Sequence, residues 1–378
     1  MAFVYLSNYS DWPMGGMLNY VRNIIPYFKD NNICDVDIWG GTKDKEEKTS
    51  FEIDDREYKF FKYTDIHTYN KLLPNFLVSF FGALKNGYRF KEYDVIYSHT
   101  AATTIALKLT NPHKCVVHHQ HGLSYKNNKG FTRFLNIGYT IAQLISDATI
   151  FVASTEELEE HQKRKIFKNK RFYAIGSPIK YKKIRQVCIE KKRKNYLRFV
   201  YTGRLDAWKN INLLIDSFKM YHDECAQQDV LTLVGDGPQY EELLTRIKKE
   251  EVDYIKLVGR KNFDELSLIL AQSDIFLFPS RGEGVSLSLL EAFAAGLPAV
   301  AFDVVGVNNF VKDGETGILE EKITAENFKN GIVRASKGYD RWIQNCVNVS
   351  RDYDAEIISE KIMKIIIAVV CAGSRKAE

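Results

Sequence analysis

Two glutamates eight positions apart are the residues of this chain best suited to chemistry. Glu283 follows an apolar stretch at 275–278 that is expected to be a strand, and Glu291 falls inside a Leu/Ala-rich helix that stops at Gly296. If most of the interval is helical, eight residues rise about 12 Å, roughly the span between the two sugars of a nucleotide sugar. The free amides at the start of the helix would then bind a diphosphate. The alternative is a buried helix with one glutamate, although charged residues are seldom buried without a partner.

A pair of cations follows a second apolar stretch, 199–202. Arg204 and Lys209 lie five positions apart in an expected loop that also contains Gly203. Open α/β sheets bind ligands beyond the carboxyl ends of their strands. Both cations could therefore converge on one anion, the guanidinium as a fork and the ammonium as a point charge. The alternative is two surface bases near a turn.

Histidines mark the ends of two expected strands in the first half. His121 ends the run HHQH at 118–121, and His99 follows the preceding strand. The run could be a metal cluster, but no acidic or thiol residue is adjacent, which argues against one. Asp35 and Asp37 form a DxD pattern, yet both fall on the same face of an early strand. We therefore expect no metal site at either place.

Two glycine-containing turns precede expected helices. Gly15 and Gly16 open a helix after a first strand, where they would let the backbone approach a phosphate or a sugar. The G-x-G-x-x-G spacing of a dinucleotide site is missing. The turn GDGP at 235–238 is expected to give structural support near the nucleotide.

These motifs, in this order, resemble the GT4-type retaining glycosyltransferases. The resemblance covers nearly the whole chain, firmly over 199–320 and loosely before 125. Many members of the family read E-G-F-G-x-P where this chain has EGVSLS at 283–288. The backbone amides remain available, so we expect an altered donor preference and not a loss of catalysis. The matching motifs are Glu283-x7-Glu291, Gly203-Arg204-Leu205-x3-Lys209, the 235–238 turn, His121 and the diglycine Gly15-Gly16.

The resemblance implies a fold and an activity. The fold would be an α/β protein of GT-B type, with two Rossmann-like domains facing across a cleft that holds the active site. The activity would be transfer of a hexose or N-acetylhexosamine from a nucleoside diphosphate sugar, UDP favoured, with retention of configuration. The acceptor would be a glycan or a lipid-linked glycan in surface polysaccharide synthesis. No cofactor and no metal are implied, because cations and helix amides would take the charge of the leaving diphosphate.

The resemblance also implies roles for single residues. Arg204 and Lys209 would face the diphosphate, and His121 would approach the donor sugar. Glu283 would hold the hydroxyls of that sugar and Glu291 the ribose diol. His99 is a weaker candidate on the acceptor side. Further donor-binding positions are Gly15, Gly16, Gly203, Gly235, Arg260, Gly284, Val285, Ser286 and Leu287.

Other functions remain open on the same residues. A sugar-nucleotide epimerase of the same fold could use a similar cleft, and a non-catalytic sugar-nucleotide sensor could bind the same ligand. A phosphorylase is disfavoured because no lysine motif for pyridoxal is evident.

The length of 378 residues, with 45% apolar and 27% charged residues, predicts a globular protein of two domains. We expect an acceptor-binding domain at 1–178 and a nucleotide-sugar-binding domain at 179–355. A C-terminal helix at 356–378 would return to the first domain. The ending ISDATIFVAST at 145–155 echoes QSDIFLFPSR at 272–281, as tandem α/β domains would.

Charge is concentrated in one segment. Residues 160–198 contain fifteen Lys or Arg against two acids, although the whole chain carries only +5. We interpret this segment as the linker and residues 43–57 as a surface excursion. The segment and a helix at 69–88, rich in aromatics and flanked by cations, also predict docking on an anionic membrane surface. Nucleic acid is a less favoured partner, since no nucleic-acid-reading motif accompanies the charge.

Six cysteines without CxxC spacing read as reduced residues of a cytoplasmic protein. The start of the chain has no basic leader, and the longest apolar run, 365–373, is shorter than the ~20 residues that a membrane span needs. We therefore expect a cytoplasmic protein, peripheral on the inner face of the cell membrane at most.

Overall fold

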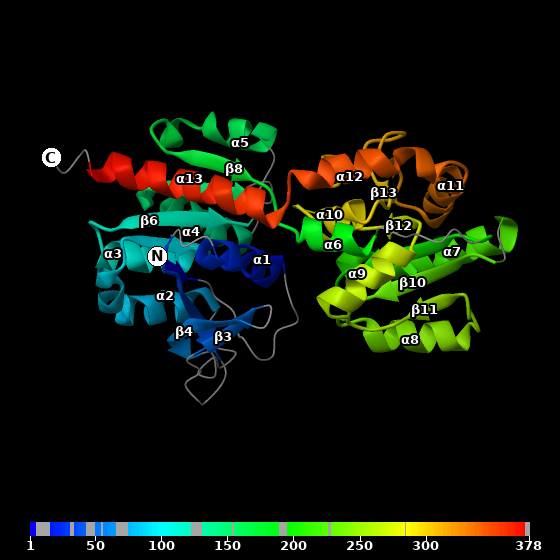
Figure 1. Ribbon diagram of the computed structural model, residues 1–378, viewed down its shortest axis with the longest axis horizontal. Helices are drawn as coiled ribbons and strands as arrows, with labels where there is room; N and C mark the ends of the chain where they lie inside the picture. The colour runs from blue at the N-terminus through cyan, green and yellow to red at the C-terminus, as the bar shows by residue number, and fades with distance from the viewer. Residues whose placement is uncertain are drawn as a thin grey trace. The chain divides into compact units, whose positions relative to one another are not determined.

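The computed structural model divides the chain into two compact units. One contains residues 1–178 and 355–378, and the other contains residues 179–354 (Figure 1). Gly15, Gly284 and the first part of the predicted helix at 69–88 lie outside the described residues. The structure describes residues 1–4, 16–30, 34–42, 50–53, 56–65, 75–121, 131–152, 155–188, 195–225, 228–283 and 285–374.

The first unit is built on an eight-stranded sheet with the order β3-β4-β2-β1-β5-β6-β7-β8. All neighbouring strands are parallel except β3 and β4, which pair antiparallel at one edge. The parallel strands end at one edge of the sheet, which is where α/β proteins carry their ligand sites. The strands are β1 (Ala2–Val4), β2 (Asp37–Thr42), β3 (Ser50–Ile53), β4 (Arg56–Asp65), β5 (Val95–Ser98), β6 (Cys115–Gln120), β7 (Ala148–Val152) and β8 (Phe172–Ile175).

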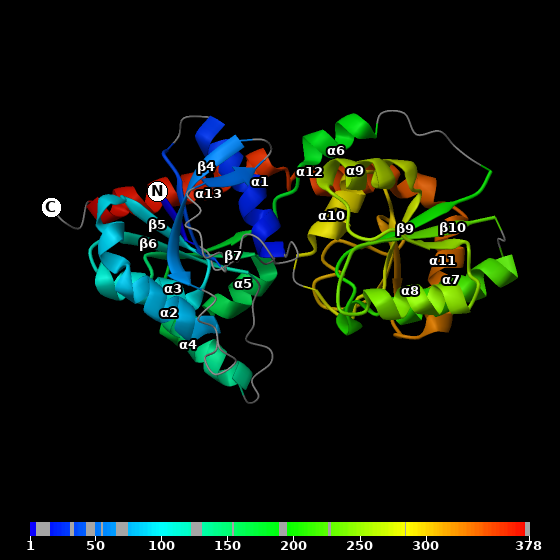
Figure 2. The same cartoon turned by 90° about the horizontal axis from the view of Figure 1, so that it is seen from below.

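Helices cover both faces of this sheet (Figure 2). On β6, His118 bonds Thr104 of α3, whereas its neighbour His119 packs on Tyr20 of α1. Because successive strand residues point to opposite faces, α3 and α1 lie on opposite faces. Helix α13 packs along α1 and also contacts β6 and β8. The helices are α1 (Gly16–Asp30), α2 (Asn75–Lys85), α3 (Ala101–Thr110), α4 (Phe131–Ile145), α5 (Thr155–Gln162) and α13 (Ala355–Ser374), with 3-10 helices η2 (Gly87–Glu92) and η4 (Lys165–Phe167).

The segments predicted as a linker and as a surface excursion both contain regular elements, and the boundary between the two units, after Pro178, falls inside the first of them. The supposed linker at 160–198 contains the end of α5, η4, strand β8 and helix α6 (Tyr181–Val187). Cations such as Lys163, Lys168 and Lys183 are exposed, whereas apolar side chains between them, such as Phe167 and Ile184, are buried. The supposed excursion at 43–57 contains β3 and the start of β4. At this end of the sheet, buried Ile53 of β3 and buried Tyr58 of β4 alternate with charged residues, as in strands that bury only one face; β3 is the edge strand, and β4 lies between β3 and β2.

The second unit has a six-stranded, fully parallel sheet with the order β11-β10-β9-β12-β13-β14. Each strand is followed by at least one helix or turn, which gives a second Rossmann-like α/β unit. The predicted class of two Rossmann-like domains is confirmed. The strands are β9 (Arg198–Thr202), β10 (Val230–Val234), β11 (Ile255–Leu257), β12 (Ile275–Phe278), β13 (Ala299–Phe302) and β14 (Gly317–Glu320).

Alternating strand residues build a separate apolar layer on each face of the second sheet. Phe199 and Tyr201 of β9 enter one layer with residues of α7, α8 and α11, whereas Val200 enters the other with residues of α9 and α10. Burial on both faces fixes the register of β9 and hence the position of the loop that follows it. The helices are α6 (Tyr181–Val187), α7 (Ile211–Cys225), α8 (Tyr240–Lys249), α9 (Phe263–Gln272), α10 (Leu287–Ala294), α11 (Ala325–Ser336) and α12 (Ile343–Arg351), with 3-10 helices η5 (Ala207–Lys209) and η6 (Tyr339–Trp342).

No helix within the described ranges combines the length and the apolar character required to cross a membrane. Helix α13 has 20 residues, but exposed charged residues interrupt it, among them Glu360, Lys361 and Lys364.

Candidate active site

The polar residues predicted in the second half gather at the carboxyl edge of the second sheet. Strands β9 and β12 are parallel neighbours, so the loops that leave them, 203–210 and 279–286, start side by side. Parallel packing thus brings together motifs that are more than 70 residues apart in the chain.

The loop after β9 is held in shape by Asp206. Its carboxylate accepts hydrogen bonds from the backbone amides of Trp208 and Lys209, at 3.0 and 3.2 Å, and so caps η5. The same carboxylate lies 3.4 Å from Nε of Arg204, whose side chain is 57% exposed. Arg204 therefore remains open to solvent on the loop, and its carbonyl accepts from the Tyr201 hydroxyl at 3.0 Å.

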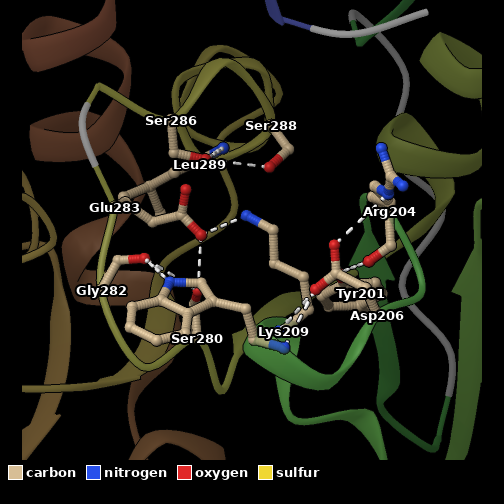
Figure 3. A network of polar contacts seen from close by, with 11 residues as sticks. Tyr201, Arg204, Asp206, Lys209, Ser280, Gly282, Glu283, Ser286, Ser288 and Leu289 are labelled. Atoms are coloured by element: carbon tan, nitrogen blue, oxygen red, sulfur yellow. Dashed lines mark hydrogen bonds and ion pairs between the residues drawn. The ribbon is translucent and has the colours of Figure 1, made fainter. Parts of the chain in front are cut away.

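Lys209 and Glu283 form an ion pair across the two loops. The Lys209 ammonium contacts Oε1 of Glu283, and the Ser280 hydroxyl donates to the same oxygen (Figure 3). Both charged side chains are largely buried, with 18% and 14% exposed, so the pair is only weakly screened by water. The structure therefore joins two of the predicted residues and adds Ser280, which the motifs did not single out.

Trp208 ties the two loops together a second time. Its indole Nε1 donates to the carbonyl of Gly282 at 2.7 Å, and its own carbonyl accepts from the amide of Arg281 at 3.2 Å. The indole is 59% exposed despite this bond. Sequence reasoning missed Trp208, although an aromatic residue next to a candidate ligand-binding lysine is a usable signal.

Close backbone packing explains the glycines of this edge. A Cβ on Gly235 would lie 1.8 Å from the carbonyl oxygen of Gly203, so the ends of β9 and β10 can approach only without side chains. Gly235 also has a φ of +146°, which side chains disfavour. Its amide donates to the carbonyl of Gly259 at 2.9 Å. This packing is consistent with the predicted role of the 235–238 turn, which is to support the neighbouring loops.

Helix α10 begins at Leu287, so the first half of the interval between Glu283 and Glu291 is not helical. The Ser286 hydroxyl accepts from the amide of Leu289 at 3.4 Å, which caps the helix. Only residues 287–291 of the interval between the two glutamates are helical, so the helical rise there is about 6 Å. The 12 Å estimate was therefore too long for the helical part.

Glu291 lies on α10 with its side chain half-buried. Burial raises the pKa of its carboxyl to about 7, and the nearby cation Lys180 opposes that rise. The carboxyl therefore changes charge near neutral pH, whereas an ordinary glutamate is fully ionised there.

Three further predicted donor positions, Arg260, Val285 and Leu287, belong to the second unit. Arg260 is exposed in the loop after β11, and Val285 and Leu287 are half-buried against the apolar layer beneath α10. In the first unit, Gly16 is the first residue of α1.

His99 and His121 come together at the carboxyl edge of the first sheet. His99 directly follows β5 and His121 directly follows β6, and Nδ1 of His99 lies 3.0 Å from Nε2 of His121. A third ring, His119, joins them from within β6. No acidic or thiol residue is adjacent to the HHQH run in sequence, but the pairing of β5 with β6 brings His99 to it from the neighbouring strand.

Burial keeps the four histidines at the ends of β5 and β6 neutral. Burial lowers the pKa of His121 to about 4 and that of His118 to about 3. The pKa values of His99 and His119 lie well below the ordinary range, chiefly through burial and also through nearby histidines.

Asp37 of the DxD pattern accepts a hydrogen bond from the Tyr93 hydroxyl at 2.7 Å.

Residues 182–347 match the family model described as glycosyl transferases group 1. An uncharacterized glycosyltransferase of Methanocaldococcus jannaschii is 27% identical over 342 residues, 85% of this chain and 86% of the relative. The UDP-Gal:alpha-D-GlcNAc-diphosphoundecaprenol alpha-1,3-galactosyltransferase of Escherichia coli is 26% identical over 297 residues, 72% of this chain and 73% of the relative.

Among solved structures, sucrose-phosphate synthase from Thermosynechococcus elongatus aligns with a TM-score of 0.76 and 18% identity, covering 98% of this chain and 99% of that one. Such structural neighbours are GT-B proteins, so the predicted GT-B fold is confirmed. The residues that match the group 1 model lie within the second unit, and the matches support a glycosyltransferase.

Proposed function

We propose that this protein is a retaining, metal-independent glycosyltransferase that takes a hexose or N-acetylhexosamine from a nucleoside diphosphate sugar. The observation that carries the proposal is the buried pair of Lys209 and Glu283, placed between the exposed Arg204 and the start of α10. A cation beside helix amides suits a diphosphate, and a carboxylate beside both suits sugar hydroxyls.

Arg204, Lys209 and the amides at the start of α10 would stabilise the leaving diphosphate. As the glycosidic bond breaks, negative charge grows on the diphosphate oxygen, and these groups oppose it without reorganising. The acceptor hydroxyl would attack from the same face, and the departing diphosphate oxygen would take its proton. The new bond then has the configuration of the old one, and the cations supply the charge that a metal supplies elsewhere.

Glu283 and Glu291 would bind the two sugars of the donor. Lys209 and Ser280 hold the Glu283 carboxylate in one orientation, from which it can accept hydrogen bonds from hydroxyls of the transferred sugar. Glu291, on α10, would accept hydrogen bonds from the ribose diol when it is ionised. His121 would approach the donor sugar, and His99, whose Nδ1 lies 3.0 Å from Nε2 of His121, is the weaker acceptor-side candidate.

UDP is the favoured nucleotide and a lipid-linked glycan the favoured acceptor. The Escherichia coli relative is named for UDP-galactose and for a diphosphoundecaprenol-linked acceptor, and its match covers 72% of this chain. This points to assembly of a surface polysaccharide. The replacement of Gly and Pro by serines at 286 and 288 changes the loop beside the donor, so the donor sugar need not be galactose.

A donor panel followed by a transfer assay tests the proposal. UDP, GDP, ADP and TDP sugars are first compared by thermal shift, because a bound donor raises the unfolding temperature by mass action. The stabilising donor, radiolabelled, is then incubated with a membrane extract, and the anomeric configuration of the product is read by NMR. A labelled α-linked product from an α-linked donor supports retention. Free epimer would indicate an epimerase, binding without turnover a sensor, and an inverted product would overturn the mechanism.

We also propose that the first unit docks on an anionic membrane surface. Phe81 and Tyr88 are 58% and 67% exposed on α2 and η2, and Lys85 and Lys91 are exposed beside them. Each basic residue near such a surface contributes about 1 kcal/mol, and the aromatic rings insert at the headgroups. A lipid-linked acceptor would then be within reach.

Flotation with phosphatidylglycerol vesicles tests the docking. The wild type should float at low salt and less at high salt, and F81A/Y88A should float less than the wild type. Leu268→Ala removes an apolar side chain of the second unit that is 51% exposed and serves as the control. Equal flotation of the double variant and the control would exclude this surface.

A further inference from the structure

Three imidazoles converge where β5 and β6 end. Nitrogens of His99, His119 and His121, one from each ring, lie within 4.8 Å of one another. The rings lie side by side, with centres 4.6 Å apart for His119 and His121, 4.8 Å for His99 and His119, and 5.3 Å for His99 and His121. The alternation of strand side chains places His119 and His121 on one face of β6, and the pairing of β5 with β6 adds His99.

These separations are close to those of a three-histidine metal site. With metal–nitrogen bonds of about 2.0 Å and tetrahedral angles, two ligand nitrogens lie about 3.3 Å apart and ring centres about 5 Å apart. The observed His99–His121 nitrogen separation is 3.0 Å, and the three ring centres are already near 5 Å apart. Small side-chain rotations would bring the third nitrogen within reach.

The contacts of His119 leave the correct nitrogen for a ligand. Its Nδ1 is hydrogen-bonded to the Tyr97 hydroxyl, so this nitrogen can donate a proton and leave the lone pair on Nε2. Nε2 is buried and has no hydrogen-bond partner among the residues that the structure describes. Metal-bound histidines commonly have this arrangement, with the second nitrogen fixed by an oxygen acceptor.

We infer that His99, His119 and His121 bind a divalent transition-metal ion such as Zn²⁺ through three imidazole nitrogens. Neutral imidazoles are borderline ligands that suit zinc, cobalt, nickel and copper and not magnesium or calcium. Burial keeps these rings neutral, so the ion need not displace three protons at neutral pH. His118 takes no part, because its ring faces Thr104 on the other side of the strand.

The site has a consequence for transfer that rests on the proposed function. His121 cannot approach the donor sugar while its lone pair is bound to a metal ion. Zinc at site-filling concentrations should therefore inhibit the transferase, and a chelator should restore the rate. The ion is an inhibitor in this account and not a cofactor.

Cobalt titration tests the site without any assay of activity. Untagged chain is titrated with CoCl₂ in a background in which the exposed cysteines Cys225 and Cys371 are serine, because free thiols bind cobalt themselves. We expect visible d–d absorption of a four- or five-coordinate ion that saturates at one Co²⁺ per chain and disappears on addition of zinc. Only the weak spectrum of octahedral aqueous cobalt at saturation would overturn the inference.

Three variants locate the ion. Tyr97→Phe removes the group that fixes the His119 ring and should weaken binding about tenfold or more. His119→Gln should abolish the cobalt spectrum and, in the transfer assay, the inhibition by zinc, while the transfer rate without zinc is retained. His113→Gln replaces an exposed histidine in the turn before β6 and should change nothing.

The variant results separate the site from the activity. A cobalt spectrum that survives both Tyr97→Phe and His119→Gln would overturn the assignment, and circular dichroism checks that each variant is folded. If cobalt binds as expected and no transfer is found with any donor, the metal site stands and the proposed function fails. If transfer is found and cobalt does not bind, the reverse holds.

Discussion

Strands β5 and β12 have the same place in their sheets, each hydrogen-bonded to the first strand of its own unit. Their carboxyl ends nevertheless differ in charge. Beyond β12, Glu283 forms an ion pair with Lys209, and Arg204 is exposed nearby. Beyond β5, His99 lies among other imidazoles that burial keeps neutral.

The difference shows how one topology can support two kinds of site. The second unit provides fixed charges, which suit a diphosphate that leaves with negative charge. The first unit provides neutral nitrogen ligands and hydrogen-bonding groups, which suit a sugar, a hydroxyl or a borderline metal ion. The sequence similarity between 145–155 and 272–281 relates β7 to β12. These two strands are not equivalent in the two sheets, because β5 is the strand of the first sheet that corresponds to β12.

The largest expected effect is an opposite response of the two units to pH. In the first unit the buried histidines have lowered pKa values, so their contribution to stability is present above pH 6.5 and is lost as the pH falls toward 4. Each buried imidazole should cost about 2 kcal/mol at pH 4.5, and several together roughly 5 kcal/mol. In the second unit the raised pKa of Glu291 acts the other way. Stability decreases as the pH rises from 4.5 through 7, by up to about 3 kcal/mol.

Hydrogen exchange read by mass spectrometry, corrected for intrinsic exchange rates, measures each unit separately. Peptides of β5 and β6 should lose protection between pH 6.5 and 4.5, before peptides of β9 and β12 do. Glu291→Gln is the matched control, since it should remove the change in the second unit between pH 5 and 8 and leave the first unit as it was. Simultaneous loss of protection in both units would remove the contrast.

The next effect concerns the cations of the second unit. Lys209→Ala and Arg204→Lys should each lower kcat tenfold or more, because the charges act mainly as the diphosphate departs. EDTA should leave the wild-type rate nearly unchanged in zinc-free buffer. Lys322→Ala, at an exposed position away from these loops, is the control. A strict requirement for Mn²⁺ or Mg²⁺ would contradict this account and direct attention to Asp35 and Asp37.

A third test separates the two glutamates. Glu283→Gln should chiefly lower kcat, by about tenfold, because its carboxylate faces a sugar that gains positive charge in the transition state. Glu291→Gln should chiefly raise the donor KM, since the ribose is held equally in the ground and transition states. The wild-type donor KM should decrease, by up to about tenfold, as the pH rises from 6 to 8 and Glu291 ionises. A donor KM that is unchanged in Glu291→Gln, with an unfolded circular dichroism spectrum, would make that glutamate structural.

More residues of the charged group around Lys209 and Glu283 than of the histidine cluster could be predicted from the sequence. Glu283 and Lys209 could be predicted because family spacing and strand order identify them without knowledge of their contacts. Ser280 and Trp208 could not, since their roles depend on hydrogen bonds between loops that are about 70 residues apart. His119 could not either, because only the register of β6 against β5 decides which face it occupies.

Strands of the fold also differ in how well the sequence predicts them. Strands such as β9 and β12 are continuous apolar runs and were predicted almost to the residue. Strand β3, at the edge of the sheet, and strand β4 next to it alternate charged and apolar residues, so in sequence they look like a surface segment. Strand β8 lies within a stretch of high positive charge, which obscured the burial of Phe172 and Ile175.

The smallest expected effect distinguishes the two faces of one strand. His118 and His119 are adjacent on β6, but His118 bonds Thr104 of α3 and does not face the histidine cluster. His118→Leu should lose that hydrogen bond and lower the free energy of unfolding by about 1–2 kcal/mol, with kcat, donor KM and zinc sensitivity unchanged. Thr104→Val removes the same bond from the other side, together with the bonds of Thr104 to Ser98 and Thr100, so the double variant should cost little more than Thr104→Val alone. Urea unfolding and steady-state kinetics provide both readouts. A change in kcat for His118→Leu that Thr104→Val does not share would place His118 in the reaction and remove the distinction between the faces.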